Sequence, residues 1–183
     1  MKTKLLLIAA FGLFALPAMA QGVGERTGIN AVVGAAPSTP DFAKMVAISD
    51  MFEIESSRLA QQKADADSKK FAAKMIEDHA KTSAELKQLA SKAKIELPSA
   101  MDSSHQSKID KLKGLNGADF DRQYDAMQID AHEDAVSLFD RYAKGGDNAD
   151  LKAFASKTLP HLQQHLKMAT ELKTDPATVG SGR

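Results

Sequence analysis

Apolar residues recur every three or four positions in four long segments of the chain, a spacing typical of amphipathic helices. The segments lie near residues 42–66, 68–94, 118–143 and 148–172. No segment alternates apolar and polar residues as a half-buried strand does. Helices with one apolar stripe bury that stripe by packing against each other. We therefore predict an all-α fold, an antiparallel four-helix bundle.

Residues that start and stop helices flank these segments. Thr39 is placed to cap the first helix, with a proline directly after it. Asp67-Ser68 forms a tight connection to the second helix, which predicts that the first two helices pack antiparallel. A short extra helix is expected at 103–113, in the connection between the second and third long helices. Gly145-Gly146 ends the third long helix.

The first twenty residues have the three parts of an export signal. Lys2 and Lys4 precede an apolar run at 5–16, and the small residues Ala18 and Ala20 follow it. The apolar run is shorter than the roughly 20 residues that a membrane-spanning helix needs. We expect cleavage after Ala20, which leaves no transmembrane anchor. The mature protein is then expected in the periplasm or loosely associated with the cell envelope.

The rest of the chain reads as one domain with short flanking segments. Residues 21–38 are rich in Gly, Ala, Val and Pro without periodicity, as in a flexible linker. The helical pattern fills 39–175, a length that suits one domain with its own core. Residues 176–183 are predicted to form a disordered tail.

Composition excludes several classes of function. The chain has 24 basic and 24 acidic residues in an interspersed pattern, so no nucleic-acid partner is expected. It has no Cys, which excludes disulfides, thiolate metal ligands and a Cys nucleophile. It also lacks a Gly-x-Ser-x-Gly elbow, a phosphate-binding glycine loop and a His-Glu-x-x-His motif. These absences favour a binding or structural role over an enzymatic one.

Four polar residues fall on the predicted apolar stripes. His79, His132 and His165 lie on the second, third and fourth helices, and Glu53 lies on the first. Counting about 1.5 Å per residue from the turns places these residues near mid-height, with His165 about one turn deeper. In an up-down-up-down bundle they converge.

Imidazole with one carboxylate suits a single transition-metal ion such as copper, zinc, iron or nickel. The predicted ligands are therefore His79, His132, His165 and Glu53. Alternates are His161, which depth counting favours, with Glu55 and Asp78. The competing interpretation is that each inward residue only forms a hydrogen bond inside the core.

Several motifs resemble those of the exported bacterial family named domain of unknown function 4142. They are Glu53-Ile54-Glu55, Met75-Ile76-Glu77-Asp78-His79, Phe120-Asp121-Arg122-Gln123-Tyr124 and Leu159-Pro160-His161-Leu162-Gln163-Gln164-His165-Leu166. The resemblance covers about residues 42–172 and implies a ferritin-like bundle in the cell envelope. It implies no established reaction.

Di-iron bundles of the ferritin-like class carry Glu-x-x-His on two helices. Here Ile76 and Leu162 stand at the positions three residues before His79 and His165. A mononuclear, histidine-rich site is therefore the expectation. Two hypotheses remain open: a metal-binding bundle of the envelope, and a structural or interaction module with an unknown envelope partner and no metal.

Overall fold

A computed structural model describes residues 34–173, which form five α-helices and no β-strand. The helices are α3 (Thr39–Lys63), α4 (Ala66–Lys92), α5 (Ser103–Lys113), α6 (Gly117–Gly145) and α7 (Ala149–Lys173). The all-α class and the short extra helix are thereby confirmed. The predicted export signal at 1–20, most of the linker at 21–38 and the tail at 176–183 lie outside the described residues.

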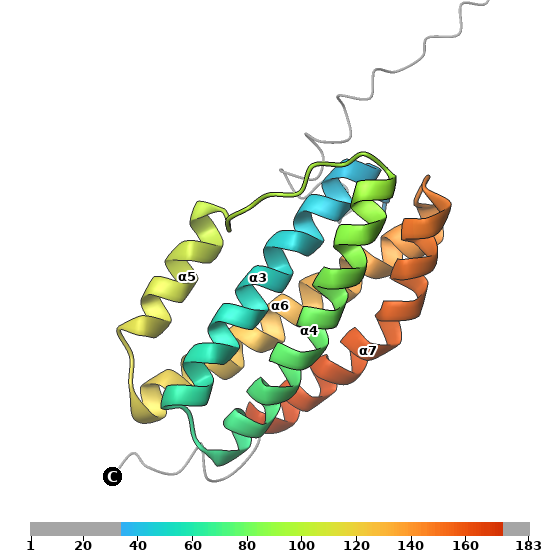
Figure 1. The fold of residues 1–183 in the computed structure, drawn as a ribbon. Coiled ribbons are helices and arrows are strands. Elements are labelled where there is room, and N and C mark those ends of the chain that lie inside the picture. Colours follow the sequence, from blue (N-terminus) through green and yellow to red (C-terminus); the bar gives the residue numbers. More distant parts are fainter. Residues whose placement is uncertain (1–33, 174–183) are drawn as a thin grey trace, which may run out of the picture.

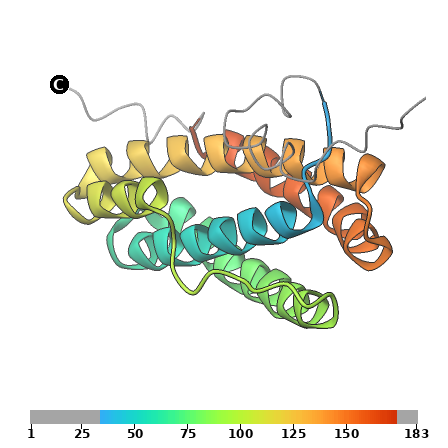
Figure 2. The ribbon, with the colours of Figure 1, turned by 90° about the horizontal axis from the view of Figure 1, so that it is seen from above.

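The four long helices lie side by side, and neighbouring helices run in opposite directions (Figure 1). Helix α3 packs against α4 and α6, while α7 packs against α6 and α4. Helix α5 lies on the outside and packs mainly on α3 (Figures 1 and 2). Each long helix therefore faces two others across a shared interior.

Two predicted helix starts were wrong by one or two residues. Helix α3 is capped by Ser38, whose hydroxyl oxygen accepts from the backbone N–H of Asp41 at 3.3 Å, and Thr39 is already helical. Helix α4 is capped by Asp65, two residues before the expected connection. The Asp65 carboxylate accepts from the backbone N–H groups of Asp67 and Ser68, which satisfies two otherwise unpaired donors.

The apolar core is divided into two clusters along the long axis of the helices. One cluster includes Phe71, Phe120 and Tyr124, and the other includes Phe42 and Phe139. In the order of the chain, each long helix passes from one cluster to the other. The residues between the clusters are buried but polar: Asp50, Glu53, Ser56, His79, Gln128, His132 and His165. A polar layer therefore separates two apolar halves of the interior.

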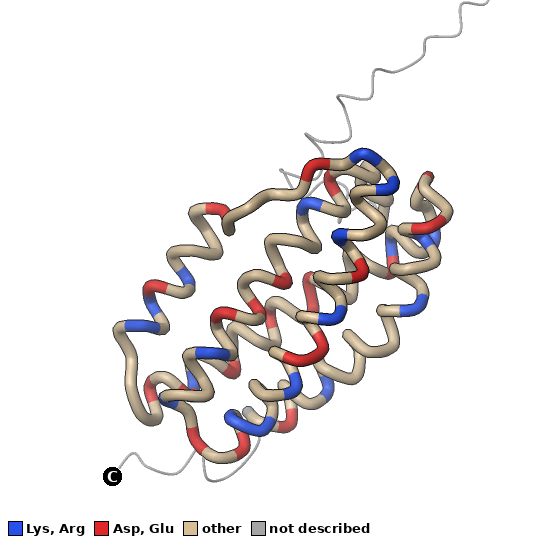
Figure 3. Tube along the Cα trace, viewed as in Figure 1, with Lys and Arg blue, Asp and Glu red and all other residues tan. Residues whose placement is uncertain are grey.

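The outer surface carries both signs of charge. Lys and Arg are interspersed with Asp and Glu along the helices (Figure 3). Many of these charges pair within one helix, such as Lys81 with Glu77 and Lys144 with Asp140. Within residues 34–173, no helix is long and apolar enough to cross a membrane.

Candidate metal centre

Three histidines from three helices meet in the polar layer. His79 comes from α4, His132 from α6 and His165 from α7, and their exposed fractions are 3%, 1% and 3%. The ring centroids form a nearly equilateral triangle with sides of 5.7, 5.6 and 5.5 Å. One nitrogen from each ring points inward, and these three atoms lie within 4.8 Å of one another.

The outer nitrogen of each ring is held by an acceptor. His79 Nδ1 donates to Asp50 Oδ1 at 2.8 Å, and His132 Nδ1 donates to the Gln128 carbonyl oxygen at 2.8 Å. His165 Nε2 lies 3.0 Å from Asp78 Oδ2. Carboxylate and carbonyl oxygens only accept, so each outer nitrogen carries the hydrogen. In a neutral ring the inner nitrogen then presents a lone pair.

The inner nitrogens of His79, His132 and His165 have no hydrogen-bond partner. Leaving a buried polar atom unpaired costs about 1–3 kcal/mol, and native proteins rarely do so. Three nitrogens bound to one zinc-like ion can be at most about 3.6 Å from one another, given bonds of about 2.1 Å in a planar arrangement. The rings therefore have to move inward to bring all three nitrogens to one ion. Outer nitrogens fixed by carboxylate or carbonyl acceptors are also typical of metal-bound histidines.

The pKa values of two of the three histidines favour the same interpretation. Burial, followed by the positive charge of His79, lowers the pKa of His132 to about 3 and the pKa of His165 to about 4. Burial also opposes the charged form of His79, but the hydrogen bond and charge of Asp50 outweigh it, so the pKa of His79 is raised. At neutral pH, His132 and His165 are therefore neutral, as metal ligation requires. His79, whose charged form is favoured by Asp50, has to release a proton when it binds the ion.

Glu53 approaches the centre from α3 and is 1% exposed. Neither of its carboxylate oxygens has a hydrogen-bond partner. Burial raises the pKa of Glu53 to about 7, and the charge of nearby His79 opposes that rise. The three inner nitrogens form a closely spaced group, and the Glu53 oxygens are not part of it. Glu53 thus lies beside the histidine triangle, and its role as a fourth ligand stays a prediction.

The three alternate ligands lie outside the triangle. His161 is exposed, one turn before His165 on α7, because four residues advance a helix by about 6 Å. Glu55 follows Glu53 by two residues, faces away from it and pairs weakly with Arg58 at 3.9 Å. Counting residues from the turn favoured His161, whereas the structure places His165 in the triangle and His161 at the surface.

Asp78, the third alternate, supports the centre from outside. Its Oδ2 atom is held by Lys74 Nζ at 2.7 Å and lies 3.0 Å from His165 Nε2. Asp78 is therefore placed to orient the imidazole of His165.

Sequence reasoning missed Asp50. This residue is 2% exposed, and its second oxygen accepts from Ser83 Oγ at 3.0 Å. Asp50 precedes Glu53 by three residues, so both occupy the same face of α3. This spacing could have revealed Asp50 from the sequence, because an acidic residue on the apolar stripe that carries Glu53 is unusual.

Together the helices and the histidine triangle define an all-helical protein with a buried polar centre. Residues 25–172 match the family described as Domain of unknown function (DUF4142), and the chain belongs to that family. Comparisons with curated proteins and with solved structures find no match.

Proposed function

We propose that this protein binds one transition-metal ion through His79, His132 and His165. The observation that carries the proposal is the set of three buried inner nitrogens without partners, each on a ring whose outer nitrogen is already held. Each partner on the outside fixes the direction in which the corresponding lone pair points. This is the arrangement expected of a pre-organised ligand set.

The donor set limits the metal. Three imidazole nitrogens, with a carboxylate nearby, suit copper, zinc, iron or nickel rather than calcium or magnesium, which prefer oxygen ligands. The absence of Cys from the chain excludes thiolate-rich centres.

The centre is closed to solvent, because the exposed fraction of each histidine is 3% or less. A catalytic ion keeps an open position for water or substrate. The burial therefore favours a held ion, with a structural or storage role, over a substrate-processing site, and we assign no reaction.

We further infer that the four long helices form an antiparallel bundle of the ferritin-like class. The alternating helix directions and the inward polar layer support this inference (Figure 1). We also propose export through residues 1–20. N-terminal sequencing of protein from a periplasmic fraction should begin at Gln21, whereas an intact Met1 form in the cytoplasm would overturn the proposed export.

The decisive experiment is metal analysis of protein purified without an affinity tag. We expect close to one equivalent of a transition metal per chain by elemental analysis, and a rise in thermal midpoint when metal is restored after chelation. His165→Ala should abolish the rise. His161→Ala, a matched change on the exposed side of the same helix, should leave it intact.

Two outcomes would overturn the metal proposal. One is the absence of metal-dependent stabilisation with copper, zinc, iron and nickel. The other is equal stabilisation of His165→Ala and the unmodified protein. Either result would favour the alternative, in which the inward polar residues only fix the register of the helices in an envelope module.

A further inference from the structure

Helix α3 carries a second apolar face in addition to the one that faces the interior. Ala47, Met51 and Ile54 are spaced by four and three residues, which places them on one side of the helix. All three are half-buried. Helix α5 covers a neighbouring part of α3 with Ile109 and Leu112, whose side chains are fully buried. The rest of this second face remains open.

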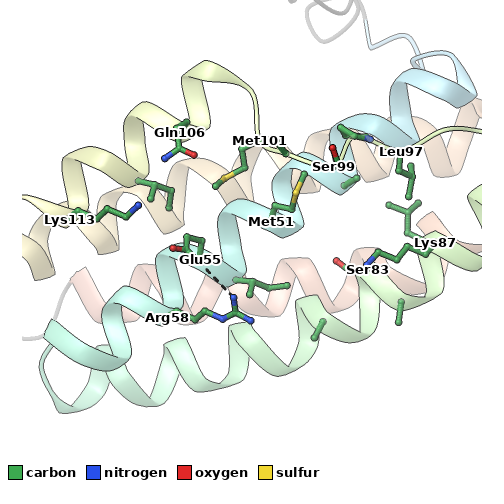
Figure 4. A pocket seen from close by; sticks show the side chains of 18 residues that line it. Met51, Glu55, Arg58, Ser83, Lys87, Leu97, Ser99, Met101, Gln106 and Lys113 are labelled. Atoms are coloured by element: carbon green, nitrogen blue, oxygen red, sulfur yellow. Dashed lines mark ion pairs between the residues drawn. The ribbon is translucent and has the colours of Figure 1, made fainter.

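The open face forms the floor of a groove between α4 and the segment that includes α5 (Figure 4). Ala80 and Ala84 line it from α4, and Leu97 and Met101 line it from the connection between α4 and α5. The groove has a volume of about 960 Å³. That volume falls at the upper end of the range of about 300–1,000 Å³ found for small-molecule sites.

The shape and lining of the groove fit an extended apolar chain. Its floor runs from Ala47 to Arg58, a distance of about 16 Å at about 1.5 Å per residue. Apolar side chains line the middle of this length, including Met51 and Ile54. Figure 4 shows Met51 among them. A compact polar metabolite would leave these side chains uncovered.

The charges that line the groove are mostly positive. Arg58, Lys87 and Lys113 line it together with a single acid, Glu55. Glu55 lies 3.9 Å from Arg58, and Lys113 has Asp110 at 3.8 Å.

Lys87 has no ion pair within residues 34–173. It lies on α4, beyond Ser83 toward the Leu97 end of the groove (Figure 4). The chain as a whole has equal numbers of basic and acidic residues, so this positive lining is a local feature.

We propose that the groove binds one medium-chain fatty acid, with the carboxylate at Lys87 and the chain along Met51 and Ile54. Burial of the chain provides the main favourable free energy, at roughly 25 cal/mol per Å² of apolar surface removed from water. The unpaired ammonium of Lys87 selects an anionic head group. This binding goes beyond the proposed metal site and does not depend on it, since none of the three histidines lines the groove.

The test measures laurate binding to metal-stripped protein by displacement of a fluorescent fatty-acid analogue. Laurate should displace the analogue with a stoichiometry of one per chain, below its micellar concentration. Dodecanol and dodecylamine, which share the chain length but not the negative charge, should bind more weakly. Measuring the metal-stripped protein separates a failure here from a failure of the metal proposal.

Two pairs of variants locate the site. Ala84→Trp fills the groove and should abolish binding, whereas Ala73→Trp, at an exposed α4 position outside the groove, should not. Lys87→Gln should weaken laurate binding about two- to fivefold and leave dodecanol unchanged, as expected for one exposed ion pair. Lys111→Gln, at an exposed α5 position outside the groove, is the matched control.

Three results would overturn the proposal. The first is that laurate fails to displace the analogue below its micellar concentration, and the second is that dodecylamine and laurate bind equally well. In the third result, Ala84→Trp converts a dimer into a monomer in sedimentation analysis, and the groove is then an interface between two copies of the chain.

Discussion

Replacing Asp50 with Asn removes the charge behind His79 while keeping the size of the side chain and one acceptor oxygen. Asp50 Oδ1 accepts from His79 Nδ1 at 2.8 Å, and its other oxygen is held by Ser83. Both partners of the pair are almost completely buried. The carboxylate therefore strengthens the imidazole as a ligand through a short, desolvated hydrogen bond.

The size of the effect follows from the linkage between binding and folding. Loss of an outer partner of a metal-bound histidine typically weakens metal affinity about 10–100-fold. At free metal equal to about 100 times the dissociation constant, the unmodified protein gains about 2.7 kcal/mol. Asp50→Asn should then gain only about 0.4–1.4 kcal/mol at the same metal concentration. For a domain of this size, roughly 4 °C per kcal/mol converts these gains to about 11 °C and about 2–6 °C.

The assay compares thermal unfolding with and without metal for each protein. Subtracting the metal-free midpoint removes any change that the substitution makes to the apo protein. Asp134→Asn, on the exposed side of α6, serves as the control for loss of one carboxylate charge. Its metal-dependent shift should equal that of the unmodified protein.

The same metal-dependent shift in Asp50→Asn and Asp134→Asn would contradict this prediction. That result would mean that the carboxylate of Asp50 does not tune His79, or that the metal does not bind His79. A normal shift in Asp50→Asn, together with a lost shift in His165→Ala, would exclude only the role of Asp50.

Two further predictions concern stability alone. Burial raises the pKa of Asp125 to about 7 despite a hydrogen bond from Ser68, so the folded state holds a proton that the unfolded state releases above about pH 4. The contribution of Asp125 to stability should therefore fall between about pH 4 and pH 7. In urea titrations over this range, the free energy of unfolding of Asp125→Asn should fall less, or rise more, than that of the unmodified protein, with each pKa unit equivalent to about 1.4 kcal/mol. If both proteins show the same pH dependence, Asp125 is not the titrating group. A Cβ atom added at Gly146 would lie 2.7 Å from Tyr142, so Gly146→Ala should cost about 1–3 kcal/mol, whereas Gly114→Ala, with its nearest atom at 3.5 Å, should cost little.

Much of the fold could be predicted from the sequence because helical periodicity is a local property. The four long helices and the short helix at 103–113 all appear in the structure, with ends within a few residues of the prediction. Errors occurred at the caps, where Ser38 and Asp65 compete with neighbouring Thr and Ser residues for the same role. Helix-capping propensity alone does not decide which of two neighbouring polar residues becomes the cap.

The inward direction of the three histidines was also readable, because each residue turns a helix by a known angle. His79, His132 and His165 all lie on apolar stripes, and the structure buries all three. The choice between His161 and His165 could not be made by counting from a turn. Counting from a turn assumes that neighbouring helices start at the same height, whereas their relative height is set by packing.

Partners across helices were decided only by the tertiary structure. Asp50 meets His79 from a different helix, and Asp78 meets His165. The groove over Met51 likewise depends on α5 covering only part of the second apolar face of α3. A periodic pattern specifies which face of one helix is apolar, whereas the rotation and height of two helices relative to each other come from the interdigitation of all their side chains.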